Sequence, residues 1–143
     1  MTTIRKYIPV LFGDNGGGDE APTYGDITPA IDEWVKGYYY GENPIGVYHY
    51  YTNAAYSNTP NLRANAGDIL VFINNPSTST TDLCCFSEKQ TDVTEDLPFY
   101  RIRIGTKDGA RYECVLPEGT KYFTLTKQYT KTGDITVTLT KGE

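Results

Sequence analysis

The sequence predicts a mainly β protein, a single antiparallel β-sandwich of the jelly-roll or Ig-like kind, with a short N-terminal helix and an extended N-terminal arm. Two observations predict the sandwich. From residue 45 onward, short segments rich in β-branched and aromatic residues are separated by turn residues roughly every ten positions, a rhythm typical of antiparallel sandwiches and barrels. The chain of 143 residues also has room for one compact domain with its own core.

The first twelve residues are the predicted arm. They include an extended segment, Thr-Ile-Arg-Lys-Tyr-Ile-Pro-Val-Leu-Phe, whose proline confines it to a sheet edge or an arm. Alternate positions carry apolar side chains: Ile4, Ile8, Val10 and Phe12. Residues 13–27, which begin as an acidic and glycine-rich stretch, follow as a flexible linker. We expect the arm to dock on another subunit; the alternative is an edge strand that folds back on its own domain.

The predicted β domain, residues 28–143, begins with the short helix. Thr28 can cap it, Pro29 occupies the first helical position, where its missing N–H costs nothing, and Gly37 can end it. Three apolar side chains share one face of this helix and need a partner surface: Ile31, Trp34 and Val35.

Seven strands are predicted, over residues 45–52, 68–74, 82–87, 99–105, 110–116, 120–126 and 134–140. The segment 68–74 is apolar on both faces, which predicts a central strand. The last two strands alternate, so that Phe123, Leu125, Ile135, Val137 and Leu139 are expected to point inward.

Residues 99–105 and 110–116 are predicted to form a hairpin around Lys107-Asp108-Gly109. In this register the inward pairs are Ile104 with Tyr112, Ile102 with Cys114 and Tyr100 with Leu116. Arg103 would then lie opposite Glu113 as a favourable cross-strand pair on the outer face.

The formal charge of −5 argues against nucleic-acid binding, which relies on clustered basic residues. Residues 1–99 carry 5 basic and 13 acidic side chains, whereas residues 100–143 carry 8 basic and 5 acidic ones. This asymmetry could steer contacts between neighbouring molecules, or it could be an accident of a solvated surface. No apolar run approaches the about 18 residues that cross a membrane, and the N-terminus lacks a signal-peptide pattern, so we expect synthesis in the cytoplasm and no membrane partner.

The sequence offers little for catalysis. His49 is the single histidine and would have to serve every role that needs a base near neutral pH. Cys84, Cys85 and Cys114 are expected to be reduced and to act as small hydrophobes, although a Cys–His dyad is formally possible. Their spacing does not fit a zinc site. We therefore expect no enzyme, no cofactor and no metal.

Residues 66–75, Ala-Gly-Asp-Ile-Leu-Val-Phe-Ile-Asn-Asn, are similar to the strand that opens many cupredoxin-like sandwiches. Such proteins hold copper with two histidines, a cysteine and usually a methionine. One histidine and a lone Met1 do not make that ligand set, so this resemblance supports a sandwich and no metal.

Tyrosine is the outlier of the composition. Seven of the thirteen tyrosines are clustered: Tyr38, Tyr39, Tyr40, Tyr48, Tyr50, Tyr51 and Tyr56. In a strand, Tyr48 and Tyr50 would share one face, opposite His49 and Tyr51. Such a cluster is typical of a protein interface, of a sugar-binding platform, or of a helix packed on a sheet. The candidate interface or ligand-binding residues are Ile4, Ile8, Val10, Phe12, Trp34, Tyr38, Tyr39, Tyr40, Tyr48, Tyr50 and Tyr51.

An arm, a glycine tether, a short helix and a threonine-rich β domain together resemble small virion proteins of tailed bacteriophages, such as capsid decoration proteins, head fibres and tail adaptors. Residues 115–123, Val-Leu-Pro-Glu-Gly-Thr-Lys-Tyr-Phe, also resemble turns in the β-sandwich modules of phage fibre and baseplate proteins. The resemblance implies a structural component of a virion, made in the host cytoplasm, that partners other virion proteins as a homo-oligomer or as a capsid or tail subunit. The competing hypothesis is a carbohydrate-binding module of a cell-surface or fibre protein, with a glycan as its partner.

Overall fold

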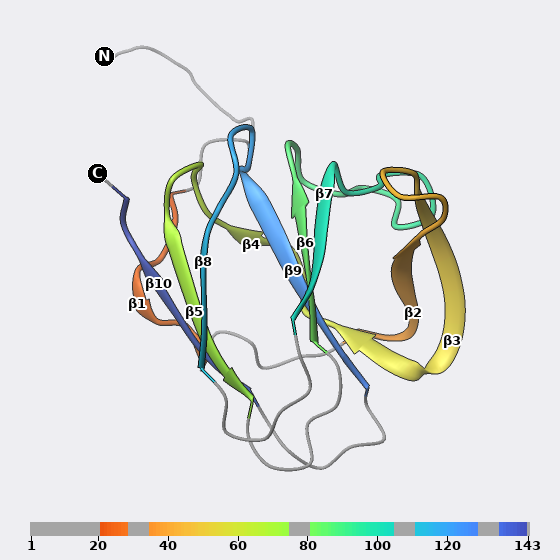
Figure 1. The fold of residues 1–143 in the computed structure, drawn as a ribbon, viewed down its shortest axis with the longest axis horizontal. Coiled ribbons are helices and arrows are strands. Elements are labelled where there is room, and N and C mark those ends of the chain that lie inside the picture. The colour runs from red at the N-terminus through yellow and green to blue at the C-terminus, as the bar shows by residue number, and fades with distance from the viewer. Residues whose placement is uncertain (1–20, 29–34, 75–80, 105–110, 129–134, 143) are drawn as a thin grey trace, which may run out of the picture.

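The protein is described here by a computed structural model that covers residues 21–28, 35–74, 81–104, 111–128 and 135–142. Within these residues the chain is mainly β, with ten strands in two antiparallel sheets (Figure 1). The mainly β architecture with two packed sheets confirms the coarse fold expected from the sequence.

The first sheet has the order β1-β10-β5-β8. Its strands are β1 (Gly25–Asp26), β5 (Ile69–Asn74), β8 (Arg111–Val115) and β10 (Ile135–Thr140). β5 lies between β10 and β8, as its apolar character on both faces predicts. β1 pairs with β10 although both of its residues fall in the stretch assigned to the linker.

The second sheet has six strands. They are β2 (Val35–Glu42), β3 (Tyr48–Asn58), β4 (Leu62–Arg63), β6 (Thr81–Phe86), β7 (Tyr100–Ile104) and β9 (Tyr122–Gln128). The main path is β2-β3-β9-β6-β7, and β4 pairs with β9.

This second sheet curls into a half-barrel at an irregularity of the β2–β3 pairing. Lys36 pairs with Ser57 but Tyr38 pairs with Thr52, so residues 53–56 of β3 lie opposite Gly37 alone. Extra residues on one strand bend it and increase its twist. β2 and β3 therefore curve away from the rest of the sheet (Figure 1).

The curl creates two cores. The first lies between the sheets and includes Leu70, Leu83, Phe123 and Leu125. The second is aromatic and lies within the half-barrel; its buried members are Tyr38, Tyr40, Cys84, Phe86 and Tyr122. Consecutive residues of β6 contribute to different cores. This arrangement explains why residues 83–86 are apolar without alternation.

The helix predicted from Thr28 to Gly37 is wrong at its C-terminal end, because residues 35–37 belong to β2. Residues 29–34 lie outside the described part of the chain. Thr28 does not cap a helix in the described residues; its hydroxyl instead accepts a hydrogen bond of 2.7 Å from the backbone N–H of Val137 in β10. Gly37 has φ +110°, a conformation that suits glycine at the irregularity of the strand pair.

The predicted hairpin of residues 99–116 is also wrong, because its two strands lie in different sheets. β7 pairs with β6, where Ile102 faces Leu83, and β8 pairs with β5, where Glu113 faces Val71. Two strands that are connected as a hairpin in one sheet and two strands that lie in facing sheets both turn every second residue toward the core. Tyr100, Tyr112 and Cys114 pack against the first core, as either connection would require, whereas Ile102, which was also predicted to point inward, is 39% exposed.

Candidate functional site

The clustered tyrosines lie mainly on the β2–β3 hairpin. Across it, Tyr39 pairs with Tyr51 and Tyr40 pairs with Tyr50. Residues that pair directly share a face, and the face changes with each step along a strand. The hairpin therefore divides the tyrosines into two sets, one toward the half-barrel interior and one toward its outside.

The inner tyrosine cluster consists of Tyr38, Tyr40 and Tyr50. The rings of Tyr38 and Tyr50 stack at 5.4 Å, and the ring of Tyr40 meets that of Tyr38 edge to face at 5.6 Å. The Tyr40 side chain is fully buried; its hydroxyl donates to the carbonyl of Val93 at 3.1 Å and accepts from the Gln90 amide. Burial raises the pKa of Tyr40 well above its usual range. This cluster forms the second core and offers no free surface at Tyr38 or Tyr40.

The outer tyrosine cluster consists of Tyr39, Tyr51 and Tyr56, all partly exposed. Tyr39 is its centre: its ring lies 5.1 Å from that of Tyr51, nearly parallel at 18°, and 4.7 Å from that of Tyr56. The exposed His49 ring meets Tyr51 edge to face at 6.0 Å. Tyr39 therefore has an aromatic neighbour in each of Tyr51 and Tyr56, and the three rings form one contiguous, partly exposed patch.

Gly41 sets the position of Tyr51. A Cβ atom at this position would lie 2.8 Å from Cε2 of Tyr51 and 3.4 Å from Cε2 of Tyr39. Gly41 is not among the glycines with positive φ, so its backbone does not require glycine. The small side chain is needed because Tyr51 lies close over the strand.

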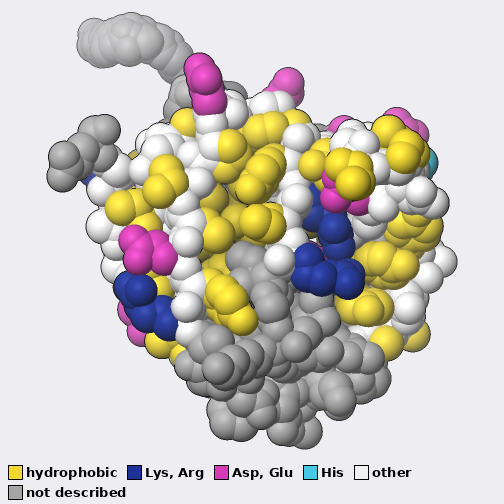
Figure 2. All heavy atoms as spheres, viewed as in Figure 1, with side chains coloured by type: hydrophobic (Ala, Val, Ile, Leu, Met, Phe, Trp, Pro, Cys, Tyr) yellow, Lys and Arg dark blue, Asp and Glu magenta, His cyan; other side chains and the backbone are white. Residues whose placement is uncertain are grey.

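A charged cluster joins the two ends of the half-barrel. On β7, Arg101 contacts Asp82 of β6 at 3.0 Å and Glu42 of β2 at 3.8 Å. The backbone N–H of Arg101 donates to the Tyr48 hydroxyl at 3.2 Å, and Arg103 contacts Asp82 at 3.2 Å. Figure 2 shows basic side chains over β7, in a hollow between apolar patches. These contacts hold the hairpin that carries the tyrosines against β7.

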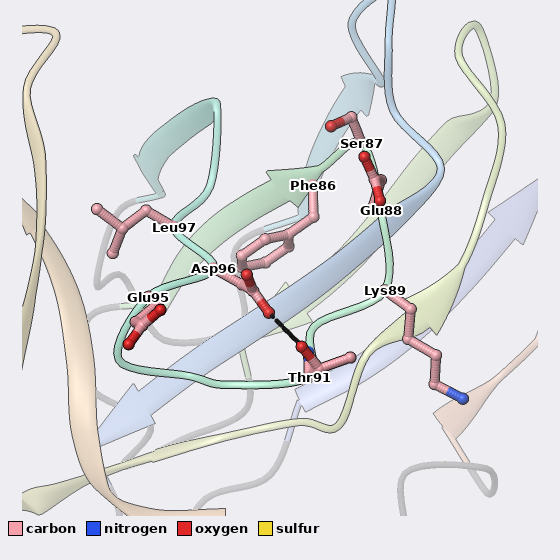
Figure 3. Close-up of a pocket in the computed structure, with 8 residues that line it drawn as sticks. All are labelled: Phe86, Ser87, Glu88, Lys89, Thr91, Glu95, Asp96 and Leu97. Carbon is pink, nitrogen blue, oxygen red and sulfur yellow. Dashed lines mark hydrogen bonds between the residues drawn. The ribbon is translucent and has the colours of Figure 1, made fainter.

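A polar pocket of about 370 Å³ lies beside the loop that follows β6 (Figure 3). The Asp96 carboxylate is turned toward Thr91 and accepts hydrogen bonds from its backbone N–H at 2.7 Å and from its hydroxyl at 3.0 Å. It accepts a third hydrogen bond, at 2.9 Å, from the backbone N–H of Asp92. The backbone hydrogen bonds from Thr91 and Asp92 lower the pKa of Asp96. The carboxylate is therefore committed to its own loop.

The described cysteines and the histidine are poorly placed to act as a nucleophile and its base. Burial raises the pKa of the Cys85 thiol to about 12 and that of Cys84 further still, which opposes formation of a thiolate. His49 lies on the outside of the hairpin, whereas Cys84 belongs to the second core. Among the described residues, no group of three or more His, Cys, Asp or Glu side chains could hold a metal ion, and no helix is long and apolar enough to span a membrane.

Five of the predicted site residues belong to parts of the chain that the structure does not describe. Ile4, Ile8, Val10, Phe12 and Trp34 lie outside the described residues. Tyr56 was not a predicted site residue. The irregularity in the β2–β3 pairing brings Tyr56 to Tyr39, and such an irregularity leaves no periodic signal in the sequence. The role of Asp82 was missed too, although a carboxylate within an apolar strand is a signal that could have revealed it.

No protein-family model matches the chain, and comparison with curated proteins finds no relative of it.

Proposed function

We propose that this protein is a structural, non-enzymatic component of a virus particle, such as a phage capsid or tail accessory protein, and that the outer tyrosine cluster is a contact surface for a neighbouring protein. In this proposal the fold is a jelly-roll or Ig-like sandwich with one sheet curled. The assignment to a virus particle rests only on the resemblance of the sequence to small virion proteins of tailed bacteriophages. The contact surface is supported by the geometry of the tyrosines.

The observation that carries the contact surface is the pair of ring contacts that Tyr39 makes, stacked with Tyr51 and tilted against Tyr56. Tyrosines offer apolar area with a polar tip, a combination enriched in protein interfaces. Ring edges and hydroxyls can pack against, and hydrogen-bond with, a protein surface of matching shape. Gly41 leaves the room that the Tyr51 ring occupies, and the contact of Arg101 with Glu42 ties the hairpin to β7. A surface that is ordered before its partner arrives has a lower ordering cost of binding.

The alternative, a carbohydrate-binding module, needs aromatic faces that are open to stack on sugar rings. Tyr39 has a neighbouring ring at 5.1 Å and another at 4.7 Å, which leaves less of its face open. Tyr51 and Tyr56 are the remaining candidates for a sugar contact. The stacking therefore favours a protein partner, and glycan binding is kept as a distinct outcome of the experiment.

Substitution of Tyr39 by alanine tests this proposal. In the organism that makes the protein, the tagged wild type should sediment with a particle, and Tyr39→Ala should weaken that association with little change in melting temperature. Ile45→Ala is a matched control, because Ile45 is 94% exposed on the same hairpin but outside the cluster. If Tyr39→Ala instead loses binding to a glycan array and still sediments with the particle, the carbohydrate-binding module is favoured. Turnover that His49→Ala abolishes would overturn the non-enzymatic proposal.

A further inference from the structure

β8 lies at one edge of the first sheet. In the described part of the chain it pairs with β5 alone. Just beyond β8, the backbone N–H of Leu116 donates to the carbonyl of Asp68 at 2.9 Å. Hydrogen bonding alternates along an antiparallel strand, so the backbone groups of Tyr112 and Cys114 also face β5, whereas those of Arg111, Glu113 and Val115 face the open edge.

The outer face of β8 carries two opposite charges. Arg111 and Glu113 are both exposed, and their side chains contact each other at 3.3 Å. Figure 2 shows basic and acidic side chains next to each other on this side of the molecule. Val115, at the end of the strand, is 67% exposed. An edge strand of this kind can accept a further strand through its backbone.

We propose that two copies of this chain pair through β8, antiparallel about a twofold axis at Tyr112, so that their first sheets join into one continuous sheet. In this register Arg111 of each copy lies opposite Glu113 of the second copy. Both residues have open backbone groups, so they form a hydrogen-bonded pair, and the pair occurs twice because the contact is symmetric.

The order of the charges selects this register over its neighbours. Sliding the strands by two residues in one direction places Glu113 opposite Glu113 of the second copy. Sliding them by two in the other direction places Arg111 opposite Arg111. Like charges directly opposite destabilise a strand pair, and a shift by one residue would turn the outer face of one strand against the inner face of the other.

This contact goes beyond the tyrosine surface and does not depend on it. β8 belongs to the first sheet, whereas the outer tyrosine cluster belongs to the second. The dimer can therefore fail while the tyrosine contact survives, and the reverse is equally possible. The two sets of variants distinguish these outcomes.

Sedimentation velocity of the full chain over a series of concentrations tests the proposal. The wild type should dimerise, and Glu113→Arg or Arg111→Glu alone should weaken the dimer about tenfold or more, because each turns two attractive cross-strand pairs into repulsive ones. Glu118→Arg is the matched control for Glu113→Arg, since Glu118 is exposed in the turn after β8 and its substitution makes the same change in charge. Melting temperatures should stay near that of the wild type.

Two further measurements separate the register from a general effect of charge. The double variant Arg111→Glu/Glu113→Arg should restore the dimer, because each pair is only reversed. An equal mixture of the two single variants should form a heterodimer, since one copy then presents two basic and the other two acidic side chains. A wild type that stays monomeric up to about 1 mM, or a dimer that both Glu113→Arg and Arg111→Glu leave unchanged, would overturn the proposal.

Discussion

Replacing Asp82 by alanine should strongly destabilise the protein. The Asp82 side chain is 3% exposed and accepts contacts from Arg101 at 3.0 Å and Arg103 at 3.2 Å. The Arg101 side chain is 9% exposed, so without Asp82 it stays buried with Glu42 at 3.8 Å as its remaining carboxylate. Removing one partner of a buried ion pair costs about 3–5 kcal/mol. For a chain of this size that loss lowers the melting temperature by about 6–20 °C.

Urea unfolding followed by circular dichroism measures this loss. Arg103→Met is the control, because the Arg103 side chain is 57% exposed and its ion pair should contribute at most about 1 kcal/mol. The double variant Asp82→Leu/Arg101→Met should recover much of the loss, since replacing both buried charges by apolar side chains can be neutral. An Asp82→Ala loss below about 1 kcal/mol, or a double variant less stable than Asp82→Ala, would refute the assignment of a buried ion pair.

Three more predictions follow from contacts elsewhere. The Asp68 carboxylate accepts hydrogen bonds, each of 2.9 Å, from the Tyr24 hydroxyl and from the backbone N–H groups of Asn65 and Gly142. Asp68→Ala removes this acceptor, so the free energy of unfolding measured in urea should fall by about 1–3 kcal/mol. An unchanged unfolding midpoint would contradict this. Gly41→Ala should displace the Tyr51 ring and cost about 1–3 kcal/mol, seen as shifted tyrosine ring signals in NMR spectra; unshifted signals would show that the site has room. Because burial raises the pKa of Cys85 to about 12, the native thiol should resist a thiol reagent at pH 8 and react after unfolding. In the unfolded chain the Cys85 thiol loses its proton near the ordinary pKa of 9.0, whereas the native chain keeps it, so the free energy of unfolding should fall as the pH rises above 9.0. If the native protein is labelled as fast as the protein in urea, the thiol is not buried.

The sequence located most strands of the described chain because their signals are local. Segments 68–74, 82–87, 99–105, 110–116 and 134–140 coincide with strands to within a residue or two. The inward positions of Phe123, Leu125, Val137 and Leu139 are likewise confirmed, because a half-buried strand shows its buried face in its own alternation. β2 was missed because Gly37 was interpreted as the end of a helix, although the run of three tyrosines after it favours a strand.

Strand partners and the fate of the tyrosines were decided by the tertiary structure alone. A hairpin and a crossover between sheets need the same apolar alternation, so the sequence could not tell that β7 pairs with β6 and β8 with β5. The division of the tyrosines depends on the curl of the second sheet, which buries Tyr40 in the second core and leaves Tyr39 partly exposed on the outside of the half-barrel. Composition determined that this chain has an unusual amount of tyrosine to bury or to present; long-range pairing determined which ring does which, because burial depends on neighbours far away along the chain.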